Sequence, residues 1–304
     1  QTPVLAPRQP ISLDPAASVL HYAQEIFEGL KAYRHPDGAL GLFRPEANAA
    51  RFNASAARLA MPALPEELFL GAIRALLEVE GGALYLRPYM IATEAFLGVR
   101  PARQYKFITI ASPAGNYFKS GAKAVSIWIS EYTRAAPGGT GAAKCGGNYA
   151  ASLVPTGQAF AMGHDQVLFL DAVERRWVEE LGGMNLFFVF DDGTVITPPL
   201  TGTILPGITR DSLITLLGEQ GFRVSETPYA IDQWRADAAS GRLVEVMACG
   251  TAAVVSAVGK VAGPDGEFNI GAGGIGQVTA RIRETLVGIQ TGRIPDTHGW
   301  VMRV

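Results

Sequence analysis

The stretch GGTGAAKCGGNYAASL, residues 138–153, surrounds one lysine, Lys144, with glycines and small residues and contains no acidic residue. Its first residues belong to a Pro- and Gly-rich segment, 132–141, where the pattern of helices and strands stops and then restarts. We therefore predict an interdomain linker at 132–141, a first domain at 1–131 and a second at 142–304. Lys144 itself could bind a phosphate, act as a covalent nucleophile or be a surface charge.

The length and charge of the chain narrow its class. A chain of 304 residues is long for one hydrophobic core, which favours two domains. With 26 Lys and Arg against 28 Asp and Glu, the net charge of -2 gives no reason to expect nucleic acid or an acidic membrane as partner. No apolar run approaches the ~20 residues of a membrane span, and no signal peptide is recognisable. We expect a cytoplasmic protein that interacts with small molecules.

Periodicity predicts an α+β first domain and a mixed second one. In the first, apolar residues at helical spacing predict helices over 46–59 and 65–80, and Pro36-Asp37-Gly38 predicts a hairpin turn. In the second, we expect hairpins, helices and strands at these places: a hairpin over 166–180, a turn at 191–193, helices after 148, from 209 and over 277–292, and a strand over 242–250.

Several familiar sites are disfavoured by their spacing. A phosphate-binding loop needs Gly before the lysine and Ser or Thr after it, but Ala143 and Cys145 stand there. The segment GAGGIG, residues 271–276, matches a dinucleotide fingerprint by letter, yet we expect no strand after it and therefore no βαβ unit. The four histidines are scattered, no metal-ligand spacing is present, and no G-x-S-x-G elbow occurs.

Lysine chemistry remains as a candidate. An amine nucleophile must be neutral, and a free lysine with a pKa near ~10.4 is almost wholly charged at neutral pH. An apolar, acid-free environment favours the neutral amine, and the residues around Lys144 could supply one. On composition alone, a solvated surface lysine is the commoner interpretation of such a loop, so the choice depends on the rest of the chain.

Seven separated stretches together resemble the branched-chain amino acid aminotransferases. They follow one another in the family's order over nearly the whole chain: LHYAQEIFEGLKAY, FRPEANAARFNASAARLAMP, ALYLRPYMIATEAFLGVRP, YTRAAPGGTGAAKCGGNYAASL, LDAVERRWVEELGGMNLFFV, GTILPGITRDSL and ACGTAAVVSAVG. The resemblance implies a class IV aminotransferase of fold type IV that depends on pyridoxal 5'-phosphate (PLP), with a small N-terminal α/β domain and a larger C-terminal pseudo-barrel domain.

The resemblance also implies the activity. Leucine, isoleucine or valine would give its amino group to 2-oxoglutarate in a ping-pong reaction, in a homodimer whose active sites are completed across the interface. D-amino acid transaminases and aminodeoxychorismate lyases share this fold and stay as alternatives. A nucleotide- or PLP-carrying protein without catalysis is the alternative from another class.

The cofactor residues that the resemblance implies begin with Lys144. This lysine would form the Schiff base with PLP and shuttle the substrate α-proton. Glu180, which lies five residues before Asn185 and next to its competitor Glu179, would face the ring nitrogen, and Tyr149 would hydrogen-bond the ring oxygen. The phosphate would be bound by the remaining members of the set, Arg51, Ile208, Thr209 and Thr251.

The substrate residues implied in the same way form an aromatic wall with one cation. They are Tyr22, Phe27, Tyr85, Arg87, Tyr132, Thr251 and Ala252, with Leu97 and Val99 contributed across the dimer interface. We expect Arg87 to bind the γ-carboxylate of glutamate and Tyr132 to close over the substrate. No metal is expected. One departure from the family is Pro155, which we expect to interrupt the helix after Lys144.

Overall fold

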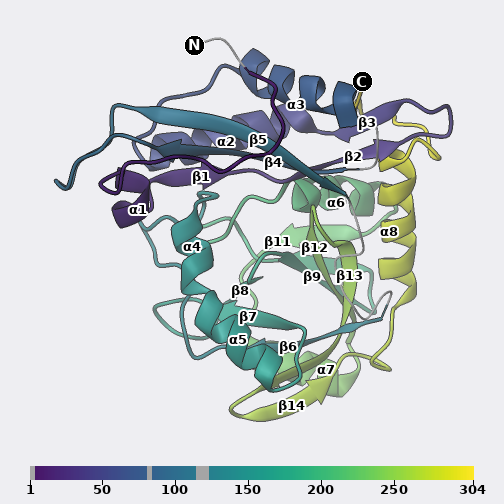
Figure 1. The fold of residues 1–304 in the computed structure, drawn as a ribbon. Helices are drawn as coiled ribbons and strands as arrows, with labels where there is room; N and C mark the ends of the chain where they lie inside the picture. The colour runs from purple at the N-terminus through teal and green to yellow at the C-terminus, as the bar shows by residue number, and fades with distance from the viewer. Residues whose placement is uncertain (1–3, 81–83, 114–122) are drawn as a thin grey trace. The chain divides into compact units, whose positions relative to one another are not determined.

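Residues 4–80, 84–113 and 123–304 are described by the structure, a computed structural model. Contacts within the chain divide it into two units (Figure 1). The first comprises Gln1–Gly115, Ala143–Gly147 and Gly288–Val304, and the second Asn116–Ala142 and Asn148–Val287. The short segment that carries Lys144 therefore belongs to the first unit, although the chain on both sides of it belongs to the second. The role of 132–141 as a linker stays a prediction.

The first unit contains a six-stranded sheet in which every pair is antiparallel. Its strands are β1 (Glu25–Phe27), β2 (Leu30–Arg34), β3 (Leu40–Phe43), β4 (Leu84–Ala92), β5 (Tyr105–Pro113) and β15 (Val301–Arg303). The short strands β1 and β2 pair with two successive parts of one edge of β4, and β5 pairs with its other edge. The two residues between β1 and β2, Glu28 and Gly29, thus lie beside the middle of β4.

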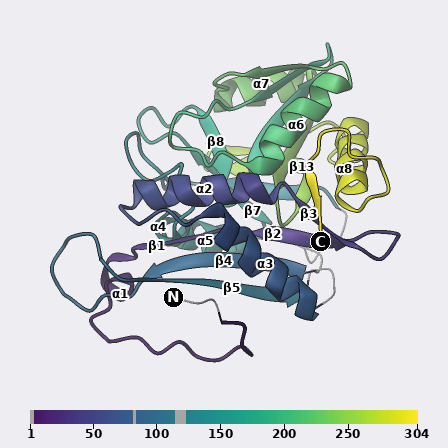
Figure 2. The ribbon, with the colours of Figure 1, turned by 90° about the horizontal axis from the view of Figure 1, so that it is seen from above.

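Two helices, α2 (Pro45–Arg58) and α3 (Glu66–Glu80), cover one face of this sheet (Figure 2). Strand β4 buries alternate residues on that face, as a half-buried strand does. Phe52 of α2 and Phe69 of α3 meet Phe107 of β5, with ring centroids 5.4–6.1 Å apart. A short helix, α1 (Ser18–Tyr22), precedes the sheet. This core makes α2 a rigid support for the polar residues on its other buried positions.

The second unit is built on a nine-stranded mixed sheet that curls on itself (Figure 1). Its strand order is β11-β10-β9-β12-β13-β6-β7-β8, with β14 paired to β13. The bounds are β6 (Val125–Ile129), β7 (Gln166–Leu170), β8 (Val178–Leu181), β9 (Asn185–Phe190), β10 (Thr194–Thr197), β11 (Arg223–Glu226), β12 (Leu243–Gly250), β13 (Val254–Gly263) and β14 (Gly266–Asn269). Every residue of the interior strand β9 is buried, so NLFFVF belongs to the core of this unit.

Five further helices lie in the part of the chain that the structure describes. They are α4 (Gly146–Ala151), α5 (Leu153–Ala161), α6 (Ile208–Glu219), α7 (Ile231–Ser240) and α8 (Gln277–Gln290). Within the second unit, Trp234 of α7 packs edge-on against Phe188 of β9 at 4.7 Å between centroids. The expected interruption near Pro155 is confirmed, because α4 ends at Ala151 and Pro155 lies in the first turn of α5, where its missing N–H costs little.

The predicted fold class is confirmed, since the chain forms a mixed α/β structure with a curled sheet. The expectation of no strand after residue 276 is wrong, because β15 pairs with β3 in the first unit. A three-residue strand whose partner lies so far away in the sequence leaves no local signal. Among the described residues, no helix is long and apolar enough to cross a membrane.

Candidate active site

Lys144 lies in the loop just before α4, and its backbone is fixed on both sides within the first unit. Its N–H donates to Oγ of Ser55 on α2 at 2.9 Å, and its carbonyl accepts the N–H of Phe27 in β1 at 3.0 Å. The amine Nζ lies 5.0 Å from the centroid of the Phe27 ring. The loop is therefore anchored to both the helix and the sheet, which directs the amine toward β1.

The surroundings of this amine favour its neutral form. Burial lowers the pKa of Lys144 to about 8, although part of the residue's surface stays accessible. The positive charges of Arg51 and, to a smaller extent, Arg87 contribute to this lowering, whereas the negative charge of Glu28 opposes it. A lysine held in this way has a sizeable neutral fraction near physiological pH, as a nucleophile or a general base requires.

Arg51 on α2 is buried and paired with Glu28, which is fully buried. Its Nε donates to Oε1 at 2.8 Å and its Nη2 to Oε2 at 2.9 Å, so one edge of the guanidinium is bound in bidentate fashion. Asn48 donates to the same carboxylate at 2.7 Å. Despite its own burial, Glu28 has a lowered pKa because Arg51, Lys144 and Asn48 all favour its charged form.

Arg87 of β4 lies among aromatic rings. Its guanidinium carbon is 4.7 Å from the centroid of Phe27 and 5.4 Å from that of Tyr85, and its Nη2 donates to the Tyr85 hydroxyl at 3.1 Å. The Nε atom is buried and makes no hydrogen bond within the described part of the chain. Such an arginine has a donor left for an incoming carboxylate, and three of the predicted substrate residues are brought together here.

A second carboxylate near Lys144, Glu25 of β1, supports the turn after this lysine. It accepts the N–H of Gly146, and a side chain at Gly146 would collide with it, so the turn needs glycine there. Burial raises the pKa of Glu25, while the hydrogen bond from Gly146 and the charge of Arg87 oppose that rise.

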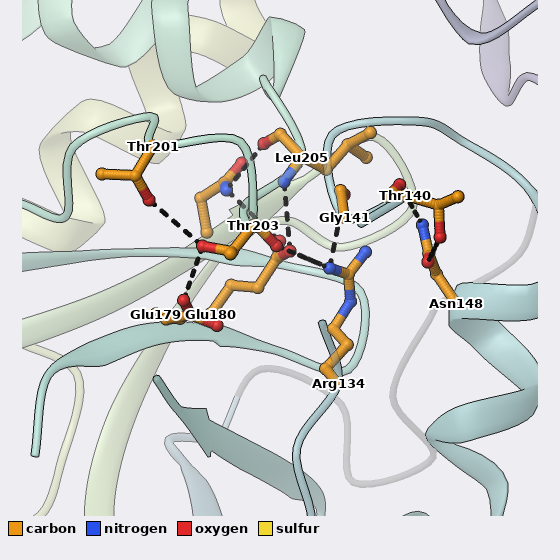
Figure 3. Close-up of polar contacts among 10 residues, drawn as sticks. Arg134, Thr140, Gly141, Asn148, Glu179, Glu180, Thr201, Thr203 and Leu205 are labelled. Atoms are coloured by element: carbon orange, nitrogen blue, oxygen red, sulfur yellow. Dashed lines mark hydrogen bonds and ion pairs between the residues drawn. The ribbon is translucent and has the colours of Figure 1, made fainter. Parts of the chain in front are cut away.

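The second unit holds a separate polar cluster around Glu180 of β8 (Figure 3). Arg134 contacts its carboxylate at 2.7 Å, and both side chains are 4 % exposed. The N–H of Leu205 donates to the same carboxylate at 3.1 Å, and the Asn185 amide approaches it at 3.5 Å. A carboxylate in this position could accept a hydrogen bond from a protonated ring nitrogen.

The neighbouring Glu179 has a different environment (Figure 3). It accepts the hydroxyl of Thr203 at 2.5 Å, while the carbonyl of Thr203 accepts Nη1 of Arg134 at 3.1 Å. Burial raises the pKa of Glu179, an effect that Thr203 and Arg134 only partly offset. The two adjacent carboxyl groups thus differ in their partners, and the cation pairs with Glu180.

Helix α6 begins at Ile208, and Thr209 is buried in its first turn. Its N-cap residue, Gly207, has no side chain to cap the helix. Gly207 is required because a side chain there would collide with the Asn185 amide, which in turn donates to the carbonyl of Leu205 at 3.1 Å. The first amides of a helix lack intrahelical partners, so those of Ile208 and Thr209 could bind an anion.

The other predicted residues lie as follows. Thr251 and Ala252 form the turn between β12 and β13, and that turn follows directly on the pairing of Cys249 with Asn185. Tyr149 lies on α4. In the first unit the Tyr22 hydroxyl donates to the carbonyl of Leu97. Leu97 and Val99 are 69 % and 87 % exposed, and Tyr132, in the second unit, is 48 % exposed.

Sequence reasoning missed several polar residues that hold the predicted ones in place. They are Glu25, Glu28, Asn48 and Ser55 in the first unit and Arg134 and Thr203 in the second. The available signal was the spacing of Asn48, Arg51 and Ser55, which places three polar residues on one face of a helix. No group of His, Cys, Asp and Glu among the described residues could hold a metal ion.

Comparison with known proteins agrees with this geometry. Residues 25–261 match the family model "Amino-transferase class IV". A branched-chain-amino-acid aminotransferase of Mycolicibacterium smegmatis (strain ATCC 700084 / mc(2)155) is 58% identical over 98% of this chain and 84% of its own length. The chain belongs to the class IV aminotransferases, and among them to the branched-chain-amino-acid aminotransferase family.

Solved structures of this family have the same fold. The branched-chain amino acid aminotransferase of T.th. with pyridoxamine 5'-phosphate has a TM-score of 0.86 and 31% identity, over 98% of this chain and 95% of its own. The same enzyme complexed with N-(5'-phosphopyridoxyl)-L-glutamate has a TM-score of 0.84 and 30% identity, over the same shares. Class IV aminotransferases depend on PLP, and the predicted fold type and cofactor are confirmed.

Proposed function

We propose that this chain transfers the amino group of leucine, isoleucine or valine to 2-oxoglutarate, with PLP as cofactor and Lys144 as the catalytic residue. The observation that carries the proposal is the state of Lys144: a single lysine, anchored at both backbone groups, whose pKa is lowered to about 8 by burial and by Arg51. A surface lysine would have neither the anchors nor the lowered pKa.

The residues present fit PLP. The phosphate needs cations and free amides, which Arg51 and the uncapped start of α6 at Ile208 and Thr209 supply, with Thr251 as a further donor. The pyridine nitrogen needs an anion, which Glu180 supplies because Arg134 keeps its charge compensated. We assign Tyr149, on the helix that follows Lys144, to the ring oxygen.

Lys144 moves the proton in this reaction. When bound, PLP supplies an electron sink for the charge left at the substrate α-carbon once its proton is removed. The neutral amine of Lys144 accepts that proton, and the lowered pKa makes both proton uptake and proton release feasible near neutral pH. The anchors at Ser55 and Phe27 keep the amine at a fixed position while the proton moves.

One pocket must accept both an aliphatic side chain and the γ-carboxylate of glutamate. We assign the aliphatic side chain to the aromatic residues Tyr22, Phe27 and Tyr85, and the carboxylate to Arg87, whose buried Nε is available as a donor. The glutamate adduct of the T.th. relative supports glutamate as the second substrate. The two amino acids thus use the same site in turn, which is the basis of a ping-pong reaction.

We further propose a homodimer located in the cytoplasm. Leu97 and Val99 are exposed apolar residues on the segment that Tyr22 holds by its hydroxyl, which suits a contribution to the active site of a second copy. In this proposal Tyr132, in the 132–141 segment, and the backbone of Thr251 and Ala252 line the same substrate site.

The test is the visible spectrum of the purified protein. After PLP is supplied, we expect a chromophore whose absorption changes when L-leucine is added and returns when 2-oxoglutarate is added. Lys144→Ala should abolish the cycle. D-leucine is the control: an equal response to D-leucine would favour a D-amino acid transaminase, and pyruvate release without an oxo acid acceptor would favour the lyase. No response to any amino acid would leave only a carrier of the cofactor.

A further inference from the structure

Helix α2 carries a buried polar face toward Lys144. Asn48, Arg51 and Ser55 follow one another at spacings of three and four residues, and all three are at most 9 % exposed. Residues at this spacing lie on the same side of a helix. Ser55 binds the backbone of Lys144, while Asn48 and Arg51 both bind Glu28. Glu28 is therefore the residue on which this face converges.

The position of Glu28 is fixed by the sheet. It lies between β1 and β2, and its N–H donates to the carbonyl of Pro88 in β4 at 2.7 Å. Its side chain has an exposed fraction of 0 % and accepts bonds from Arg51, Asn48 and the N–H of Gly29. Burying a carboxylate to this extent lowers the stability of the fold unless neighbouring positive charges and hydrogen-bond donors compensate its charge.

Two arginines lie near the Lys144 amine and oppose its protonation. Arg51 and Arg87 are both positive, and Tyr85 and Glu28 act in the opposite direction, with Glu28 the larger of the two. The Phe27 ring centroid lies 5.0 Å from the amine, and Glu28, the next residue, is near enough for its charge and that of Lys144 to act on each other. The carboxylate of Glu25 in β1 is bound instead to the backbone of Gly146.

We propose that Glu28 is a positioning residue for the reaction: held by Arg51 and Asn48, its charge offsets that of Arg51 at the Lys144 amine. Without Glu28, the amine would face two arginines alone and would be too weak a base to take up the substrate proton. The proposal rests on the proposed function for the role of Lys144, but the charge relation is a property of the chain itself and exists without cofactor.

The experiment measures the reactivity of Lys144 in the PLP-free protein. Formaldehyde with cyanoborohydride methylates only the neutral amine, and peptide mass spectrometry reads the rate at Lys144 over a pH series. In Glu28→Gln we expect the pKa of Lys144 to fall by about one unit, which raises the rate at neutral pH about fivefold. In Arg51→Gln the charge of Glu28 acts unopposed, and we expect a rate about tenfold lower.

The opposite signs separate this proposal from a structural role. If Glu28 only supported the fold, both substitutions would loosen the site and change the rate in the same direction, which would contradict the proposal. Asn48→Ala is the matched control, since it removes one bond to Glu28 and no charge, and its rate should stay within about twofold of the unsubstituted protein. Glu28→Asp keeps the charge and should do the same.

If Glu28→Gln does not fold, the Arg51→Gln and Glu28→Asp variants still test the proposal. A rate in Arg51→Gln equal to or above that of the unsubstituted protein, or a fivefold change in Glu28→Asp, would overturn the proposal. Because these rates are measured without cofactor, they test the role of Glu28 even if the visible spectrum shows no transaminase activity.

Discussion

Replacing Arg134 by methionine would remove the cation of the buried pair with Glu180. The two side chains are each 4 % exposed and 2.7 Å apart, so Glu180 would lose its cation while it stays buried, with the Leu205 N–H and the Asn185 amide among its neighbours. Breaking such a pair costs about 3–5 kcal/mol of unfolding free energy. For a unit of this size we expect the melting temperature to fall by about 6–20 °C.

The assay is urea unfolding of the PLP-free protein, followed by tryptophan fluorescence, to which the buried Trp234 of the second unit contributes. Adding Glu180→Gln to Arg134→Met should restore at least about 2 kcal/mol, because the neutral amide no longer needs a cation. Arg223→Met, at an exposed pair with Asp192, is the control and should cost less than about 1 kcal/mol. A loss below about 1 kcal/mol in Arg134→Met, or additive costs in the double variant, would refute the reasoning.

Three other substitutions test the same geometry. Because the folded-state pKa of Lys144 is lowered from 10.5 to about 8, the unfolded chain binds more protons between these values and stability rises with pH across that window. Lys144→Met should therefore stabilise the PLP-free protein at neutral pH by up to about 3 kcal/mol in urea unfolding. An equal or lower stability of this variant would contradict the lowered pKa. Because the pKa of Glu179 is raised above 4.5, stability should decrease as the pH rises through that raised value, and Glu179→Gln should flatten this part of the stability–pH curve; an unchanged curve would show that Glu179 is ionised without cost. Gly207→Ala should weaken PLP binding and destabilise the protein by about 1–3 kcal/mol, because the new side chain would displace Asn185. Gly218→Ala, in open space within α6, should instead stabilise the protein by about 0.5–1 kcal/mol. Calorimetry that shows stability changes of the same sign for both variants would disprove this account.

Much of the fold could be predicted because its elements carry local signals. The turn at Pro36-Asp37-Gly38 joins β2 to β3 as expected, with Gly38 at φ 87°. The helix predicted over 46–59 is α2, Pro45–Arg58, and the one predicted from 209 is α6, Ile208–Glu219. Each has a periodic apolar face or a Pro or Gly at its boundary. The strand β15 has neither, and depends on a partner at the other end of the chain.

The candidate site divides in the same way. Lys144, Arg51 and Glu180 could be selected because the order of motifs along the chain identifies them. Glu28 and Arg134 could not, since their importance comes from partners that are distant in sequence: Arg51 for Glu28, and Glu180 for Arg134. The sequence shows which side chain could do the chemistry, whereas the charges that compensate it depend on strand register and helix packing.

The central claim is that this chain transfers nitrogen from leucine to 2-oxoglutarate and that Lys144 moves the proton in this transfer. Its most direct test is to incubate the PLP-loaded protein with L-leucine carrying isotope-labelled nitrogen and unlabelled 2-oxoglutarate, and to detect glutamate by mass spectrometry. We expect labelled glutamate and 4-methyl-2-oxopentanoate in equal amounts, and neither product with Lys144→Ala. Glutamate that lacks the label, or full turnover by Lys144→Ala, would contradict the claim.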